Sequence, residues 1–152
     1  DNATQVSENW EQLKLREKGG NKRVLSGVPS GLPSIVKAYR IQEKARNVGF
    51  DWDDASGAWD KLLEEIAELK VELDKGNHDL AEAELGDLLF ATINVARMNG
   101  LSPDNALERT NQKFIRRFNY VEEGAIAAGH NLKDMTLEEM DALWDEAKSK
   151  GL

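Results

Sequence analysis

The sequence predicts an all-α protein, a helical bundle, and two observations support this fold class. Apolar residues recur at the three- and four-residue spacing of amphipathic helices through most of the 152-residue chain. No stretch shows the alternation of β-branched residues that is typical of strands. Since a chain of this length can bury roughly two thirds of its unfolded surface, we expect a domain with its own core.

The N-terminal part is predicted to be a short helix followed by a linker. Trp10, Leu13 and Glu17 follow a helical pattern that ends at two glycines, and residues 26–33 are rich in Ser, Gly and Pro. We therefore assign residues 1–31 to an N-terminal helix and linker, and residues 32–152 to one domain.

Three helices are expected in the first part of that domain. Pro33 suits a first helical position and Gly49 can end a helix, so the first is predicted over residues 33–48. Apolar residues at helical spacing predict the second over about 58–75 and the third over about 79–98.

Two further helices are expected towards the C-terminus. Ser102 followed by Pro103 is an N-cap with a first-turn proline. Thr136 and Glu139 have the spacing of a capping box, which predicts the start of the last helix.

Charge and hydropathy limit the partners that this protein can have. With 28 acidic and 20 basic residues the formal net charge is −8, which disfavours nucleic acid and favours a divalent cation. The longest apolar stretch, residues 88–96, is much shorter than the roughly 20 residues of a membrane span, so we expect no membrane partner. Cysteine is absent, which does not fix the compartment, and no signal-peptide pattern is present; a cytoplasmic location is the default expectation.

Two pairs of acids stand out in the second and third helices. Glu65 and Glu68 are three residues apart, and Glu84 and Asp87 repeat that spacing. Residues three apart point in neighbouring directions on a helix, and the short connection favours antiparallel packing of the two helices. Because Mg²⁺ prefers oxygen ligands, the four carboxylates are predicted to hold this ion.

The simpler interpretation is that such acids form a solvated helix face. The helix over residues 79–98 argues against it, because apolar residues surround most of its circumference, as in a buried helix. Glu84, Asp87 and Asn94 then form a narrow polar stripe, and buried carboxylates need partners or a metal. Gly86 lowers helix propensity, which suggests that another helix or a ligand approaches closely there.

Other polar side chains are candidates for binding a ligand. Lys113 and Arg117 are four residues apart and can present a cationic pair to phosphate oxygens, although surface cations at this spacing usually pair with acids. Gln42 and Asn94 lie on otherwise apolar helix faces, where an amide needs a partner or a ligand edge. Trp144 could stack on a base, although a tryptophan is more often part of the core.

Four segments resemble a known family. They are Asn-Val-Gly-Phe-Asp-Trp at residues 47–52, Lys-Leu-Leu-Glu-Glu-Ile-Ala-Glu at 61–68, Glu-Leu-Gly-Asp-Leu-Leu-Phe-Ala-Thr-Ile-Asn at 84–94 and Asn-Gln-Lys-Phe-Ile-Arg-Arg-Phe at 111–118. From about residue 32 onward the sequence is similar to the MazG-type nucleoside triphosphate pyrophosphohydrolases of the all-α NTP pyrophosphatase superfamily.

The resemblance implies an enzyme that acts on acid anhydrides. It would hydrolyse a nucleoside triphosphate between the α and β phosphates, giving nucleoside monophosphate and pyrophosphate as part of nucleotide-pool housekeeping. The cofactor would be Mg²⁺, with Mn²⁺ as an alternative ion. The acids that match the family's two motifs are Glu64, Glu65, Glu68, Glu84 and Asp87, of which all but Glu64 would bind the metal.

The same resemblance implies roles for further residues. Lys61, Lys113 and Arg117 would contact phosphates. Asn94 and Trp144 would lie near the sugar or base, and Glu64 is our candidate for accepting the proton of the attacking water.

Family members also suggest how the chain is organised. The bacterial long form has two tandem copies of this domain, and the residues before Leu32 resemble the segment that joins them. We therefore expect a C-terminal half of a longer protein. Dimers or higher homo-oligomers are implied, and a second copy would complete the helical bundle.

Three other interpretations were compared with the sequence. A ferritin-like di-iron site needs Glu three residues before a His, but Lys75 and Ala127 hold those positions before His78 and His130. An EF-hand beginning at Asp51 lacks the required loop residues. A catalytically silent dimerisation or regulatory module that retains a metal site stays open as an alternative.

Overall fold

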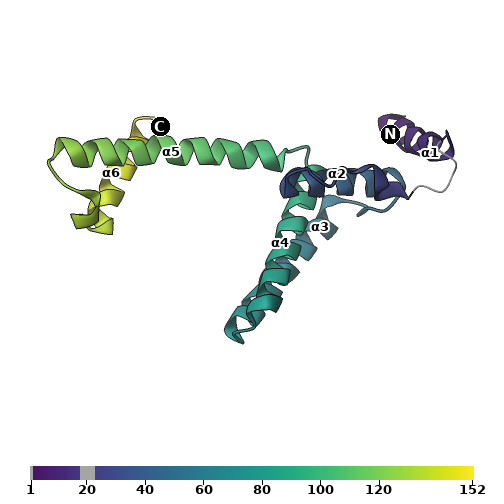
Figure 1. Cartoon of the computed structure of the whole chain (residues 1–152), viewed down its shortest axis with the longest axis horizontal. Helices are drawn as coiled ribbons and strands as arrows, with labels where there is room; N and C mark the ends of the chain where they lie inside the picture. The colour runs from purple at the N-terminus through teal and green to yellow at the C-terminus, as the bar shows by residue number, and fades with distance from the viewer. Residues whose placement is uncertain (1, 18–22) are drawn as a thin grey trace. The chain divides into compact units, whose positions relative to one another are not determined.

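The chain folds into helices joined by short connections, which confirms the predicted fold class. The computed structural model describes residues 2–17 and 23–152, and within these ranges it contains six α-helices, two short 3₁₀ helices and no strand (Figure 1). The chain divides into two units, residues 1–103 and residues 104–152, which are described separately. Within the described ranges, no helix is long and apolar enough to cross a bilayer.

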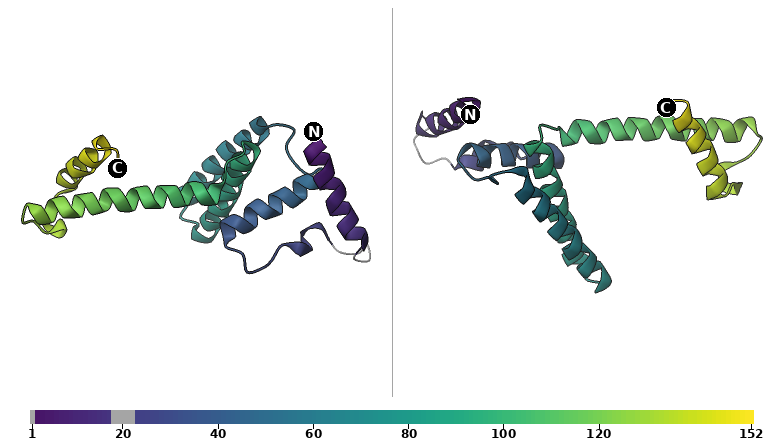
Figure 2. Two further views of the ribbon diagram at one scale, coloured as in Figure 1. Left: turned by 90° about the horizontal axis from the view of Figure 1, so that it is seen from above. Right: turned by 180° about the vertical axis from the view of Figure 1, so that it is seen from behind.

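Unit 1 is built around a helical hairpin. Helices α3 (Ala55–Asp74) and α4 (His78–Met98) run antiparallel along one another, and α2 (Ser34–Asn47) packs against α4 (Figures 1 and 2). Helix α1 (Asn2–Glu17) and the 3₁₀ helix η1 (Val24–Gly27) both contact α2. The hairpin therefore forms the centre of this unit.

Local sequence explains where these helices begin and end. The Asp54 carboxylate accepts a hydrogen bond from the Ser56 backbone N–H at 2.8 Å and caps α3. Gly49 and Gly76 have φ angles of +90° and +74°, a left-handed conformation that favours glycine, and they follow α2 and α3. The predicted helices are confirmed to within three residues at each end, whereas the N-terminal helix is longer than predicted and begins at Asn2.

Unit 2 consists largely of α5 (Pro103–Ala127), the 3₁₀ helix η2 (Leu132–Asp134) and α6 (Leu137–Ser149). The predicted capping box is confirmed: the Thr136 hydroxyl accepts from the Glu139 N–H at 3.1 Å, and the Glu139 carboxylate accepts from the Thr136 N–H at 3.2 Å. Helix α6 packs closely on α5 at Gly124, where an added Cβ would lie 2.9 Å from Leu143 Cδ2.

Among the residues whose burial the structure describes, few large apolar side chains are buried within one chain. The prediction that the helix over residues 79–98 is buried around its circumference is wrong for the single chain, because Leu85, Leu89 and Phe90 are exposed. Helix α4 packs against α3 and α2, and these neighbours leave part of its surface uncovered. The buried apolar residues are Ala58, Ala81, Ala91, Ile93, Val95, Val121, Ala125 and Ala147.

Gly86 is not approached closely by another described helix of this chain. We expected another helix or a ligand to approach it closely, but a Cβ built at this position meets no atom within 4 Å among the described residues. Gly57 is the glycine of the hairpin where such an approach occurs, since its added Cβ would lie 2.7 Å from Cε3 of Trp52.

We expect Gly86→Ala to raise the free energy of unfolding by up to about 1 kcal/mol, because alanine has the higher helix propensity and its methyl group enters open space. Urea denaturation followed by far-ultraviolet circular dichroism measures the change. Gly57→Ala is the matched control and should not give this gain, because its methyl group would collide with Trp52. A loss of stability in Gly86→Ala would show that a second chain or a ligand contacts this position.

Candidate functional site

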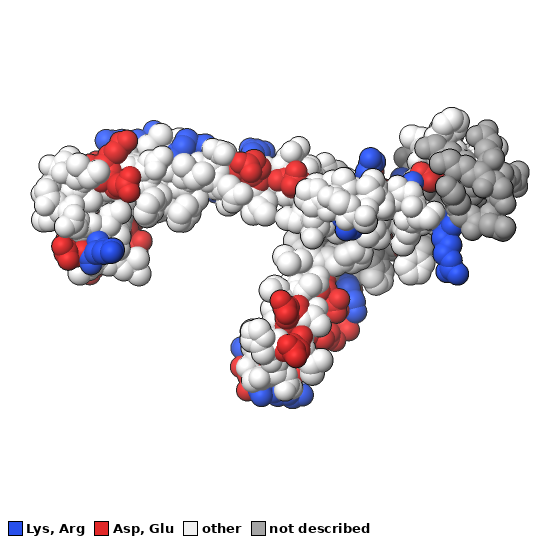
Figure 3. Space-filling view, viewed as in Figure 1, with Lys and Arg blue, Asp and Glu red and all other residues white. Residues whose placement is uncertain are grey.

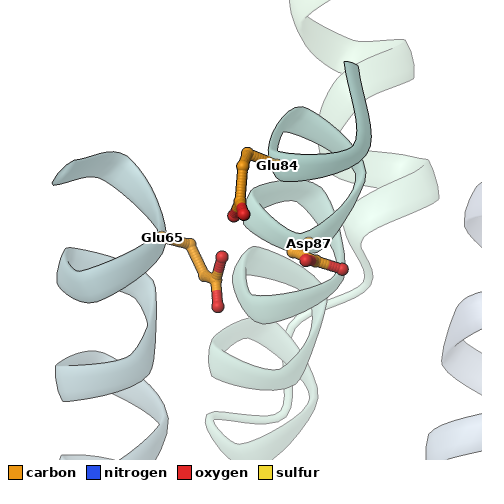
Figure 4. Close-up of side chains that lie close together, drawn as sticks. All are labelled: Glu65, Glu84 and Asp87. Atoms are coloured by element: carbon orange, nitrogen blue, oxygen red, sulfur yellow. The ribbon is translucent and has the colours of Figure 1, made fainter. Parts of the chain in front are cut away.

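Three carboxylates meet between α3 and α4. Glu65 extends from α3 toward α4, which contributes Glu84 and Asp87 (Figure 4). One oxygen from each of the three side chains lies within 4.8 Å of the others. Glu65 is buried, with 3% of its surface exposed, whereas Glu84 is half-buried and Asp87 is exposed. We call these three residues the carboxylate cluster.

Two oxygens of the cluster are buried without a hydrogen-bond partner among the described residues. They are Oε2 of Glu65 and Oε2 of Glu84. The other carboxylate oxygen of Glu65 is 3.0 Å from Nζ of Lys61. Unpaired buried oxygens are costly when both carboxyl groups are ionised, and they would be satisfied by a proton shared between Glu65 and Glu84 or by a hard divalent cation. The donor set therefore fits a metal ion.

The acids of the site differ in their pKa values. The pKa of Glu84 is raised to about 7, first by its interaction with Glu65 and then by desolvation and by Glu68. Glu65 shows the opposite direction, because its hydrogen bond with Lys61 lowers its pKa more than burial raises it. At neutral pH the metal-free site therefore holds a proton on Glu84 for part of the time.

The remaining acids of the two motifs lie beside the cluster. Glu68 is half-buried and close enough to Glu84 to raise its pKa. Glu64 is exposed, and its Oε2 is 3.5 Å from Nζ of Lys61. Figure 3 shows acidic side chains gathered on the α3–α4 hairpin. The metal-binding role of Glu68 and the catalytic role of Glu64 stay predictions.

A cavity of about 520 Å³ lies between α2, α4 and the segment that joins α2 to α3. Gln42 and Asn94, the two amides predicted to meet a ligand, both line it. Asn94 is seven residues from Asp87 on α4, so the two lie on the same side of the helix about 10 Å apart along its axis. The other side chains of the wall include Leu25, Ile41, Phe50, Asp51, Trp52, Phe90 and Arg97.

Asp51 and Arg97 join this cavity wall and were not predicted as site residues. The Arg97 guanidinium donates to both carboxylate oxygens of Asp51, at 2.9 and 2.7 Å, and also to Oδ1 of Asn94 at 2.9 Å. Burial raises the pKa of Asp51, but the hydrogen bonds from Arg97 and from the Trp52 N–H outweigh it and lower that pKa. The sequence signal for Arg97 was its position three residues after Asn94, which places both on neighbouring parts of one helix.

In unit 2 the predicted phosphate and base ligands share one region. The Arg117 guanidinium lies 5.5 Å from the ring centroid of Trp144, and its Nε donates to the Leu152 carbonyl at 2.9 Å. The Trp144 ring also packs against Phe114, with 5.1 Å between centroids. Lys113 is exposed on the same helix, where basic side chains follow one edge of α5 (Figure 3).

We expect the metal-free protein to lose stability as the pH rises from about 5 to about 7.5. The pKa of Glu84 is about 7 in the folded chain and ordinarily 4.5, so the folded chain holds more protons between these values. This stabilisation is complete below about 4.5 and is lost as the pH rises through about 7. Thermal unfolding in a chelator should show the trend, and Glu84→Gln should weaken it. An unchanged pH dependence in Glu84→Gln would contradict this assignment.

Comparison with known proteins finds related sequences. The chain is 39% identical over 152 residues to a protein named nucleoside triphosphate pyrophosphohydrolase in Escherichia coli (strain K12), with 97% of this chain and 58% of that protein covered. It is 39% identical over 140 residues to nucleoside triphosphate pyrophosphohydrolase/pyrophosphatase MazG of Thermotoga maritima, with 91% and 54% covered. It is also 48% identical over 145 residues to the uncharacterized protein YabN of Bacillus subtilis (strain 168), with 94% and 30% covered.

These relatives are longer proteins, and the chain spans little more than half of the first two. The family model for the MazG nucleotide pyrophosphohydrolase domain matches residues 56–122. That range contains the whole carboxylate cluster as well as Lys61, Asn94 and Arg97. Over residues 56–122 the chain therefore matches the MazG nucleotide pyrophosphohydrolase domain, and most of the chain is similar to the Escherichia coli and Thermotoga maritima proteins.

Proposed function

We propose that this chain hydrolyses nucleoside triphosphates to nucleoside monophosphate and pyrophosphate in a Mg²⁺-dependent reaction. The observation that carries the proposal is the pair of buried, unpartnered carboxylate oxygens on facing helices. The names of the Escherichia coli and Thermotoga maritima relatives support the substrate class. Clearing surplus or aberrant nucleotides in the cytoplasm is the corresponding cellular role.

The metal ligands in this proposal are Glu65, Glu84 and Asp87, with Glu68 beside them. When bound, Mg²⁺ or Mn²⁺ supplies charge neutralisation and polarises phosphoryl oxygens. The side chains contribute the rigid spacing of the ligands, since all four lie within helices α3 and α4.

Cationic side chains must accompany these acids, because carboxylates alone would repel a triphosphate. Lys61 is next to the cluster and partly exposed, so its ammonium group can reach a phosphate oxygen. We assign the same role to Lys113 and Arg117 of α5.

The chemical step is attack of a water oxygen on the α phosphorus atom. The bond from this phosphorus to the oxygen bridging the α and β phosphates breaks, and pyrophosphate leaves. We propose that Glu64 accepts the proton of the attacking water, because its carboxylate is exposed and lies on the helix that carries the cluster. Asn94 would bind the nucleoside, whereas both polar groups of Gln42 already form hydrogen bonds with Phe90 and Arg97.

We expect Glu65→Gln and Asp87→Asn each to lower kcat/KM for nucleoside triphosphates by about 100-fold or more, because loss of a metal ligand removes several kcal/mol of charge stabilisation. Monophosphate and pyrophosphate are quantified by ion-exchange chromatography after incubation with Mg²⁺. Glu82→Gln is the matched control, because Glu82 is an exposed acid of α4 outside the cluster.

Full activity in either ligand variant would contradict the metal assignment. A wild-type chain that binds Mg²⁺ but forms neither product would instead favour the catalytically silent dimerisation or regulatory module.

We further propose that the chain pairs with a second copy through an apolar face of α3. Trp59, Leu63, Ile66 and Leu73 lie along one side of this helix, and all four are exposed. Leu63 alone has 61% of its surface exposed. A continuous apolar face of this kind is typical of a protein–protein interface.

Leu63→Glu is expected to shift the assembly toward the monomer, because a charge would be buried at the proposed interface. Light scattering coupled to size-exclusion chromatography measures the molar mass. Leu137→Glu is the control, since Leu137 is a leucine of unit 2 that is more exposed than Leu63. A monomeric wild-type protein would remove the basis of this proposal.

A further inference from the structure

Asn94 carries both a hydrogen-bond donor and an acceptor, and its neighbours decide which of the two is left for a ligand. Its Oδ1 accepts a hydrogen bond from Arg97 at 2.9 Å. A guanidinium group donates and cannot accept, so the oxygen of the amide must face Arg97. Among the described residues, Nδ2 of Asn94 has no hydrogen-bond partner, and it is the amide group that remains for a ligand.

Arg97 is itself held in place from several directions. Its side chain is only 7% exposed, and two parallel hydrogen bonds join it to the Asp51 carboxylate. Its Nε also faces Oε1 of Gln42 at 3.4 Å, while Nε2 of Gln42 donates to the Phe90 carbonyl at 3.0 Å. The oxygens of both amides are therefore turned toward one buried cation.

The surroundings of Asn94 suit a nucleoside. The cavity of about 520 Å³ has aromatic walls in Phe50, Trp52 and Phe90, and its size is typical of small-molecule sites. Gly57 lets the Trp52 ring lie against α3, because a Cβ at residue 57 would be 2.7 Å from that ring. Asn94 and Asp87 are about 10 Å apart along α4. A nucleoside beside Asn94 would therefore lie at a distance from the carboxylate cluster, where the phosphates of the same substrate would be held.

We propose that Arg97, anchored by Asp51, is a positioning residue that makes Asn94 a hydrogen-bond donor to the nucleoside. The pocket thereby selects a nucleoside that offers an acceptor atom, such as a carbonyl oxygen or ring nitrogen of the base, at this position. This inference rests on the proposed function, because it assigns the nucleoside part of the same substrate to the cavity.

A purely structural ion pair would behave differently from a positioning pair. The Asp51–Arg97 pair also ties the segment after α2 to α4, so its loss is expected to reduce stability in either case. A variant that keeps the Asp51–Arg97 ion pair but removes the amide donor of Asn94 should lose nucleoside affinity only if the pair serves to position Asn94. Asn94→Asp makes this distinction, because its carboxylate still accepts from Arg97 but has no amide donor.

The experiment measures kcat and KM for ATP, GTP, CTP and UTP with Mg²⁺ in the wild type, Asn94→Asp and Arg97→Lys. We expect KM for the preferred substrate to rise about tenfold or more in both variants while kcat changes little, since lost ground-state binding raises KM. A lysine cannot bridge Asp51 and Asn94 with a rigid fork, so Arg97→Lys should also narrow the differences among the four bases.

Glu11→Gln is the matched control. It breaks the ion pair between Glu11 and Lys44, which are 3.1 Å apart in the same unit, and neither residue lines the cavity. KM should stay at the wild-type value in this variant. The thermal unfolding temperature of each variant is also measured, to show whether a change in KM is caused by reduced stability of the fold.

Calorimetric titration with the four nucleoside monophosphates supplies a second readout that needs no turnover. Weaker binding by Asn94→Asp, with unfolding at or above the wild-type temperature, would support the inference. Unchanged KM and unchanged monophosphate affinity in both variants would overturn it, even if the wild type hydrolyses triphosphates. A wild type that binds monophosphates but does not hydrolyse triphosphates would instead contradict the proposed function alone.

Discussion

The antiparallel packing of α3 on α4 is the constraint on which the rest of the site depends. Gly76 ends α3 with a positive φ angle, and α4 begins two residues later. Small buried residues such as Ala58, Ala81 and Ala91 allow the two helices to approach closely. This approach moves the carboxylates of Glu65 and Glu84 out of water without giving each oxygen a partner. In the proposed metal site, affinity for a cation would thus originate in helix packing, which desolvates the ligands before any ion arrives.

Local patterns in the sequence were sufficient for the helices and for the carboxylate cluster. Helical periodicity and the Thr136–Glu139 capping box depend on residues within a few positions of one another, so they can be identified before the fold is known. The cluster could be predicted because each helix supplies its acids at a fixed spacing and a short turn leaves antiparallel packing as the simplest arrangement.

Features that depend on distant residues were missed. Asp51 and Arg97 are 46 positions apart, and nothing local to either residue specifies the other as its partner. The contact between Gly57 and Trp52 joins residues only five positions apart, but it depends on the irregular segment before α3, whose conformation no helical pattern specifies. Leu85 and Leu89 were predicted to be buried but are exposed in the single chain. An apolar sequence indicates that side chains tend to be buried, but it does not show whether the same chain or another molecule covers them.

The side chains buried within one chain are mostly alanine and valine, whereas larger ones such as Trp59 and Leu63 are half exposed or more. If these exposed groups are covered by a second copy, most of the hydrophobic free energy of this protein is gained between chains instead of within one. Its unfolding temperature would then increase with protein concentration, and dilution would destabilise the folded protein. The geometry of the carboxylate cluster, which lies on the same two helices, would become sensitive to the abundance of the protein.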